Sequence, residues 1–560
     1  MSISIFGLLA APAQAQELPN AGSLLRQLRQ GIPDIAPQRA PAATAEAPTA
    51  PDAGPKIIVK GFIIEGNSLI PSVELEALLK ARQGKEQSLG DLREAAQTVA
   101  DAYRQRGYFA RAYLPAQSVD EGIVRIRVVE GRFGKIVRKD AKTRARGAFV
   151  EDVVGSRLKA GEAYSLADLE RGLLLANDLP GIGAEGALQA GELAGTSDLV
   201  LEVRDTPILS GMLGADNAGT RSTGEYRGYA GLALNNLSGY GDQLSAQIVK
   251  GARLTYGSAG WSVPLGADGW RAGVVASALR YRLGGTFKDI ESRGRAYTLG
   301  ADLSYPLIHR TDETMRVRAT FDHARYNDDM LGEAFHRKRV NRGSVELFGY
   351  RSDDWGNGGL TNYRFTLTVG GVDLSRQAED AALDAATART DGRFAKLALD
   401  LQRDQSLGRD WFLRGHIAGQ WTRENLDSSE KLSLGGPSGV RAYPINEGTG
   451  DNGLIANVEL HRPVTQGWAR SLDLYAFVDG GLVCQHAQRW EGWDAGADMD
   501  NVYPLFGAGV GANYTLPGNI GISLTAAVPI GSNRGSAQSG RNQDGSKTNP
   551  SVWLTATKTF

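Results

Sequence analysis

The chain has 560 residues, a net charge of −1 and 71 glycines. The balanced charge gives no overall field that would favour nucleic acid, so no nucleic-acid partner is expected. A mean hydropathy of −0.27 and the lack of an 18-residue apolar run exclude a membrane-spanning helix. They leave open a membrane barrel, whose strands hide apolar side chains in alternation.

Residues 1–15 are typical of an export signal. An apolar segment from Ile3 to Ala11 is followed by Ala13-Gln14-Ala15, which fits an A-x-A cleavage site. The basic start of such a signal is missing, which leaves open a translation start further upstream.

A short helix and a linker are expected next. Residues 16–31 contain an amphipathic helix with Leu24, Leu25 and Leu28 on one side. Residues 32–55 are rich in Pro and Ala and have too few large apolar side chains to pack, which predicts a flexible linker.

Two small α+β domains are expected over residues 56–131 and 132–205. In the first, strands near 57–64, 108–113 and 122–129 and helices near 73–81 and 89–106 give the order β-α-α-β-β. The sequence Ser-Leu-Gly-Asp-Leu at 88–92 recurs as Ser-Leu-Ala-Asp-Leu at 165–169, each with a serine that would cap a helix. The repeat indicates two copies of one domain.

From residue 207 to 560 the pattern alternates with period two. At 315–322, for example, Met, Val, Ala and Phe alternate with Arg, Arg, Thr and Asp. A soluble sandwich would also alternate, but aromatic residues lie near strand ends, as at a membrane interface, and the chain ends on a strand with Phe560. Lipid requires every backbone amide to be paired, so such a sheet must close into an antiparallel barrel. The length allows about 16 strands.

Three stretches of this segment carry a family resemblance. They are Asp-Asn-Ala-Gly at 216–219 with Leu-Asn-Asn-Leu at 234–237, Gly-Gly-Pro-Ser-Gly-Val-Arg-Ala-Tyr at 435–443, and Phe-Val-Asp-Gly-Gly at 477–481. Together with the two domains they resemble the two-partner secretion transporters of the haemolysin secretion/activation family, whose barrels follow polypeptide-transport-associated (POTRA) domains. The resemblance runs from residue 18 to Phe560. One departure is Ala442, where the family usually has glycine.

The resemblance implies an outer-membrane barrel of a Gram-negative bacterium, with periplasmic POTRA domains and a plug helix inside the pore. It implies that the sixth outer loop folds into the lumen, and that loop carries Val440, Arg441, Ala442 and Tyr443. The implied cargo is an adhesin- or haemolysin-like exoprotein that docks on the POTRA domains. The barrel-assembly machinery, with Phe560 as a C-terminal signal, and outer-membrane lipid are further implied partners; no cofactor is implied.

The strand at 472–479 gives an independent indication of a luminal contact. Its apolar face leaves Asp479 and Phe477 pointing into the lumen, with Gly481 two residues beyond. A guanidinium and a carboxylate can pair through two parallel hydrogen bonds, so Arg441 is the expected partner of Asp479. The alternative is that Arg441 is a solvated loop residue.

The sequence gives little support for a metal site, a catalytic site or a disulfide. The acidic stretch 491–500 lacks the spacing of a calcium loop, and a solvated outer loop is favoured. Six histidines form no zinc motif, no nucleophile elbow or P-loop is present, and the single Cys484 cannot form an internal disulfide. An enzyme barrel and a passive porin fit poorly with the repeated domains. The remaining alternative is a barrel-assembly insertase of the same superfamily.

Overall fold

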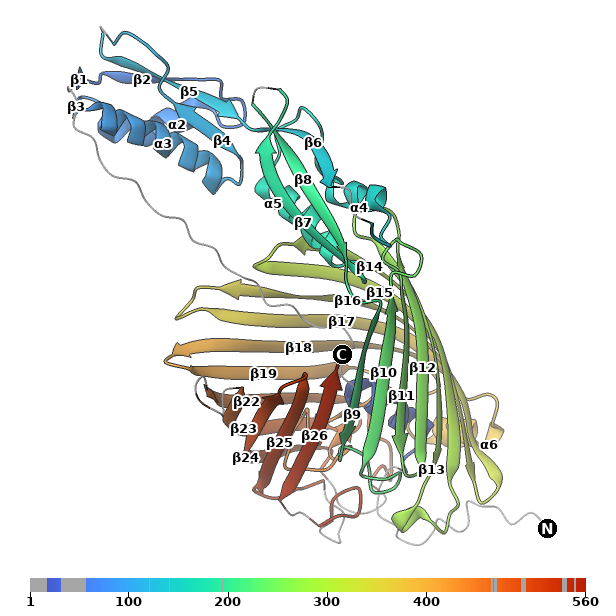
Figure 1. Cartoon of the computed structure of the whole chain (residues 1–560). Coiled ribbons are helices and arrows are strands. Elements are labelled where there is room, and N and C mark those ends of the chain that lie inside the picture. The colour runs from blue at the N-terminus through green and yellow to red at the C-terminus, as the bar shows by residue number, and fades with distance from the viewer. Residues whose placement is uncertain are drawn as a thin grey trace.

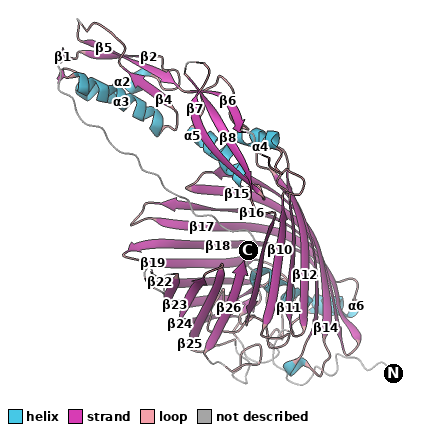
Figure 2. Ribbon diagram, in the orientation of Figure 1, coloured by secondary structure: helices cyan, strands magenta, loops and turns pink. Residues whose placement is uncertain are grey.

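The computed structural model describes residues 18–31, 57–119, 121–139, 142–193, 195–464, 467, 471–494, 500–535, 541–547 and 550–560. The expected export signal and linker lie outside these residues. Two small domains extend from one rim of a large β-barrel (Figures 1 and 2). No helix within the described ranges has the length and apolar character needed to cross a membrane.

The first domain is a three-stranded sheet with two helices on it. The sheet order is β2-β5-β4, with β5 parallel to β2 and antiparallel to β4. The strand expected at 57–64 is in fact two strands, because β1 leaves the sheet to pair with β3. The elements are β1 (Ile57–Ile58), β2 (Gly61–Glu65), α2 (Ser72–Leu79), a 3-10 turn (Lys80–Arg82), β3 (Glu86–Gln87), α3 (Leu89–Gln105), β4 (Ala110–Tyr113) and β5 (Ile123–Glu130).

The second domain repeats this topology. Its sheet order is β6-β8-β7, with β8 parallel to β6 and antiparallel to β7. Ser88 and Ser165 occupy equivalent N-caps, and each accepts a hydrogen bond from the backbone of the aspartate three residues later. The elements are β6 (Arg132–Lys139), α4 (Gly147–Val154), α5 (Leu166–Asn177), β7 (Ile182–Ala190) and β8 (Thr196–Asp205).

The expected antiparallel barrel is confirmed, with sixteen strands closed by the pairing of β26 with β9. At this closure the backbones of Phe560 and Gly211 exchange two hydrogen bonds of 2.9 and 3.0 Å. The first eight strands are β9 (Leu209–Asp216), β10 (Arg227–Asn235), β11 (Gln243–Gly251), β12 (Leu254–Pro264), β13 (Arg271–Arg282), β14 (Arg293–His309), β15 (Glu313–Met330) and β16 (Glu333–Asp353). The others are β17 (Gly359–Asp373), β18 (Gly392–Gly408), β19 (Trp411–Thr422), β22 (Asn452–Val464), β23 (Leu472–Cys484), β24 (Val502–Leu516), β25 (Ile520–Ile530) and β26 (Ser551–Thr559).

Apolar side chains cover the outside of the barrel. On β23, Leu474 and Val478 are exposed, whereas Tyr475, Phe477 and Asp479 point inward and are buried. A soluble sandwich has its apolar side chains inside, whereas this barrel has them outside. Such an arrangement suits a wall whose outer face is in contact with lipid.

The two rims of the barrel differ. The second domain lies against the rim formed by the turns near 236–242, 265–270 and 310–312, which we call the POTRA rim. There Arg171 of α5 donates to the carbonyls of Asp268 and Pro306 and to the Tyr305 hydroxyl. The opposite rim, the loop rim, carries longer connections, among them an outer helix α6 (Ala378–Ala386) and the segment 423–451, which we call the inward loop.

Candidate functional site: the occupied lumen

A helix lies inside the barrel. Helix α1 (Ala21–Gly31) is seen in blue behind β9–β11 in Figure 1. Leu24, Leu25 and Leu28 are almost fully buried in one cluster with side chains from the wall. These wall residues include Tyr256, Leu279, Tyr281, Tyr326 and Val340. The apolar stripe expected from the sequence therefore packs on an apolar patch of the lumen.

Polar contacts fix the position of α1 inside the barrel. The backbone amide of Ala21, at the start of the helix, donates to Asp328 Oδ1 of β15 at 3.1 Å. The guanidinium of Arg26 donates to the Lys431 carbonyl and to Asn446 Oδ1 at 3.2 Å. Since Lys431 and Asn446 belong to the inward loop, α1 contacts both the wall and the loop.

The inward loop is a compact structure rather than a free connection. Its ends pair through β20 (Leu432–Ser433) and β21 (Thr449–Gly450), and its tip runs through the 435–443 motif. Gly436 has a φ of 115°, which favours glycine. A Cβ on Gly439 would stand 2.0 Å from the Leu434 carbonyl oxygen, so the tight turn requires glycine there as well.

The tip of the loop is joined to the wall by Arg441 and Asp479. Arg441 Nε and Nη2 donate to the two carboxylate oxygens of Asp479 at 3.0 and 2.6 Å, and its backbone amide donates at 2.9 Å. The side chains are 8% and 0% exposed. The structure thus brings together the two residues that the sequence pattern paired, in the two-pronged geometry.

Further groups complete the Arg441 site. Glu459 of β22 accepts from Arg441 Nη1, and His461 contacts the other Glu459 oxygen at 2.7 Å. The guanidinium carbon lies 3.5 Å from the centre of the Phe477 ring, a cation–π contact. Trp553 of β26 donates to the Arg441 carbonyl at 2.8 Å. Arg441 therefore links three strands to the loop.

The other expected motif residues lie in the same place. Val440 and Tyr443 are fully buried in the cluster beneath the loop. A Cβ on Gly481 would stand 3.0–3.1 Å from methyl groups of Leu434 and Val440, so any larger residue here would require these side chains to shift.

The structure also accommodates Ala442, the residue that departs from the family pattern. The Ala442 side chain packs above Gly507, where a Cβ would stand 2.6 Å from the Ala442 Cβ. The missing side chain at Gly507 makes room for the methyl group of Ala442.

The stem of the loop carries a second set of ion pairs. Glu430 is 1% exposed and contacts Arg342 at 2.8 Å and Lys396 at 2.9 Å. Lys338 contacts Asp427 at 2.6 Å. Sequence reasoning did not single out these residues, although strand alternation alone places Lys338, Arg342 and Lys396 on the luminal face.

A buried carboxyl joins the inward loop to the last outer loop. Glu447 accepts hydrogen bonds from the Asn533 side chain and, at 2.7 Å, from the Gln543 backbone amide. Burial raises the pKa of Glu447 to about 7, against the lowering effect of these hydrogen bonds. The group therefore holds its proton at pH values where most carboxyls are ionised.

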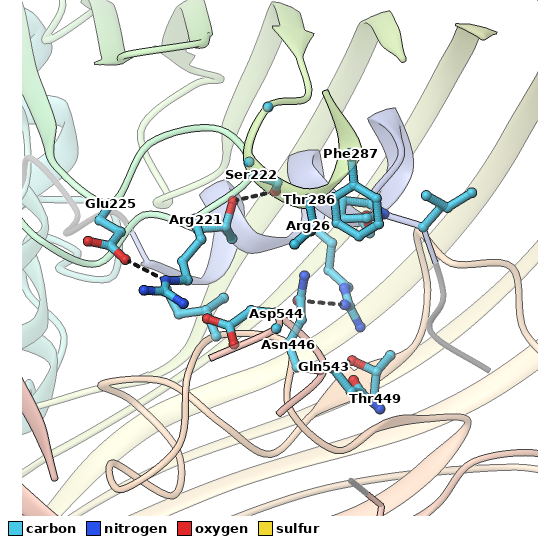
Figure 3. A pocket seen from close by; sticks show the side chains of 18 of the residues that line it. Arg26, Arg221, Ser222, Glu225, Thr286, Phe287, Asn446, Thr449, Gln543 and Asp544 are labelled. Carbon is cyan, nitrogen blue, oxygen red and sulfur yellow. Dashed lines mark hydrogen bonds and ion pairs between the residues drawn. The ribbon is translucent and has the colours of Figure 1, made fainter. Parts of the chain in front are cut away.

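The occupied lumen leaves a pocket of about 380 Å³ near the loop rim. Figure 3 shows Arg26 of α1 at its centre, with Arg221, Glu225, Thr286, Phe287 and Asp544 from the surrounding loops. The pocket lies between α1, the inward loop and three other outer loops, so it belongs to the outer mouth of the blocked pore.

No cluster of metal-binding side chains is found in the described part of the chain. Residues 495–499 of the acidic stretch 491–500 lie outside it. Cys484 is a free thiol that contacts the His486 carbonyl. The described residues of the lumen thus present contacts that hold a plug and a loop.

Comparison with known proteins agrees with this geometry. Residues 195–514 match the family described as haemolysin secretion/activation protein ShlB/FhaC/HecB. The chain belongs to this family. Residues 57–131 match the ShlB-type POTRA domain.

Relatives match over nearly the whole chain. The haem/hemopexin transporter protein HuxB of Haemophilus influenzae (strain 86-028NP) is 28% identical, covering 100% of this chain and 98% of HuxB. The outer membrane transporter CdiB of Escherichia coli O6:K15:H31 (strain 536/UPEC) is 25% identical, covering 95% and 89%. The solved structure of CdiB from Escherichia coli superimposes with a TM-score of 0.72 at 20% identity, covering 97% and 100%. The last likeness concerns the fold alone.

The protein is therefore an outer-membrane transporter of the two-partner secretion type, with its POTRA domains in the periplasm. The POTRA rim of the barrel faces the periplasm, and the loop rim faces the cell exterior. The family membership decides against the insertase alternative.

Proposed function

We propose that the chain exports one exoprotein by a route that α1 and the inward loop block at rest. The observation that carries this proposal is the occupied lumen, in which both segments are held by non-covalent contacts. Such contacts can be exchanged for contacts with a cargo chain without any covalent step, so transport needs no catalysis and no cofactor.

The cargo would be met first by the POTRA domains. Each of their sheets has two edge strands, β2 and β4 in the first domain and β6 and β7 in the second. An unfolded segment can add to such an edge through backbone hydrogen bonds, which suits a secretion domain of variable sequence. The proposed cargo is an adhesin- or haemolysin-like exoprotein. The full-length match to HuxB, which is named a haem/hemopexin transporter protein, supports a haem-acquisition exoprotein as a second candidate.

Assembly of the transporter would use other partners. Phe560 directly follows β26, the strand that closes the barrel, and its side chain is half exposed. We assign it as the signal read by the barrel-assembly machinery. The apolar outer face of the strands would then contact outer-membrane lipid.

The test is secretion of the partner encoded beside this gene. Cells that carry the transporter and that exoprotein should release it into the culture supernatant. Deletion of residues 56–205 should leave a barrel that inserts, as judged by heat-modifiable migration, but should abolish release. Normal release from that truncated protein would contradict the docking role of the POTRA domains.

A further inference from the structure

Four arginines form a group on the outside of the barrel near the loop rim. They are Arg280 of β13, Arg295 of β14, Arg325 of β15 and Arg339 of β16, and we call them the arginine belt. Arg280, Arg295 and Arg325 are exposed and Arg339 is partly exposed. Each lies on the same face of its strand as the lipid-facing residues below it.

The register places these like charges side by side. Arg280 is directly opposite Arg295, and Arg325 is directly opposite Arg339. Tyr297 is opposite Arg325, so Arg295 and Arg325 are diagonal neighbours across β14 and β15. Like charges directly opposite each other destabilise a sheet unless something neutralises them.

The protein itself supplies little neutralising charge. Among the described residues, no carboxylate lies within 4.0 Å of the guanidinium of Arg280, Arg295 or Arg325, and Arg339 reaches Asp373 only at 3.9 Å. The luminal arginine Arg342, by contrast, contacts both Asp322 and Glu430 at 2.8–2.9 Å. Three of the four belt arginines thus have no counter-charge within 4.0 Å among the described residues, and the fourth has one distant carboxylate.

The position of the belt is the boundary of the lipid-facing surface. Immediately below Arg295 on β14, the outward side chains Tyr297 and Leu299 are 48% and 62% exposed. Strand β14 has 17 residues, whereas about 10 suffice to cross a bilayer, so its outer end reaches the headgroup region. The belt lies on the loop-rim side, which faces the outer leaflet.

We propose that the arginine belt binds the phosphate groups of a phosphorylated lipid headgroup in the outer leaflet. Guanidinium groups bind phosphate oxygens bidentately, and basic residues just outside the hydrocarbon region attract anionic headgroups. Four strands at about 4.8 Å spacing make a belt about 15 Å wide, which offers room for more than one phosphate. This site is separate from the lumen and from cargo docking.

The experiment uses the full-length protein in phosphatidylcholine nanodiscs, with and without diphosphorylated lipid A. The test variant is Arg295→Gln with Arg325→Gln. The matched control is Arg351→Gln with Arg462→Gln, two exposed arginines near the POTRA rim. The wild type and the control should retain lipid A equally. The test variant should bind it roughly 30-fold more weakly, since each arginine near an anionic surface contributes about fivefold.

A second measurement separates lipid binding from a purely structural role. In discs without lipid A, the test variant should melt at the same temperature as the wild type or higher, because two like charges have been removed. In discs with lipid A, the order should reverse. A structural role would lower the melting temperature of the test variant in both discs.

Three results would overturn the proposal. One is equal retention of lipid A by the test variant and the wild type. Another is equal retention of dephosphorylated lipid A by the wild type, which would show that acyl chains alone are bound. The third is full competition by free inorganic phosphate at the same phosphate concentration, which would show an ordinary anion site rather than a lipid site.

Discussion

At the scale of single residues, the lumen depends on buried charges with several partners each. Arg441 contacts Asp479, Glu459 and the Phe477 ring, and its own carbonyl accepts from Trp553. A buried pair of this kind contributes little net stability against an apolar replacement, but it is costly to break on one side. In the proposed transport mechanism, the Arg441 contacts hold the inward loop in one position until all of them are exchanged for contacts with the cargo.

Arg441 and Asp479 should be energetically coupled. Alanine at either position leaves the other charge poorly paired, at a cost of about 1–3 kcal/mol. Secretion should fall sharply in each single variant, and the double variant should be little worse than either. Lysine at position 441 should rescue poorly, because an ammonium cannot reproduce the two-pronged contact. Losses that simply add in the double variant would show that the residues act separately.

Glu447 should make the inward loop sensitive to pH. Its pKa of about 7 in the folded loop lies above the value near 4.5 expected when the carboxyl is free. An acid whose pKa is raised by folding loses stability as pH rises from its free value to its folded value. Opening of the pore in planar bilayers should therefore be about tenfold more frequent at pH 8 than at pH 6.

Glu447→Gln should remove this pH dependence and keep the pore as closed at pH 8 as at pH 6. Glu225→Gln, on an exposed outer loop, is the matched control and should behave as the wild type. An unchanged pH response in the Glu447 variant would assign the effect to other groups, such as Asp544, whose charge raises the pKa of Glu447.

At the scale of elements, local patterns predicted most of the fold. Period-two alternation gave the barrel and the inward face of β23, and the two serine caps gave the repeated domains. The pattern could not show that the 57–64 strand divides, because that depends on β1 pairing with β3 about thirty residues later. It also could not show that α1 contacts the inward loop, since Arg26 and Lys431 are 405 residues apart.

Helix α1 should be a removable plug. A Cβ at Gly22 would stand 3.1 Å from the Ser429 Cβ. The Cβ atoms of a disulfide are about 3.5–4.5 Å apart, so a shift of a few tenths of an ångström would bring the pair to that spacing. In a Cys484→Ser background, Gly22→Cys with Ser429→Cys should cross-link α1 to the loop on oxidation. The oxidised protein should stop secreting and show low conductance, and reduction should restore both. Each single cysteine variant is the control. Normal secretion by the fully cross-linked protein would mean that α1 and the loop need not separate.

At the scale of the whole molecule, several side-chain contacts fix the second POTRA domain to the barrel rim. Glu170 accepts from Thr311, and Asp178 contacts His309 and Arg316, so α5 rests on the turn between β14 and β15. A cargo segment bound to this domain would be delivered at a fixed place beside the pore.

Arg171 should be the residue on which this anchoring most depends. Its side chain is 5% exposed, and one nitrogen donates to three oxygens of the POTRA rim. Arg171→Ala would remove the donor to these oxygens and open a gap, at a cost of about 1–3 kcal/mol. The domain should then detach transiently, so that limited proteolysis cuts faster near residues 205–207 while the barrel keeps its heat-modifiable migration. Secretion should fall in parallel.

The matched control for this prediction is Arg204→Ala. Arg204 lies in the same domain and pairs with Glu185, but both side chains are more than half exposed, so the pair contributes little. Its cleavage rate and secretion should equal those of the wild type. If Arg171→Ala is cut no faster than this control, the second POTRA domain is held by its apolar and remaining polar contacts, and Arg171 does not fix its position. If cleavage accelerates but secretion persists, a rigid approach to the pore is not required for export.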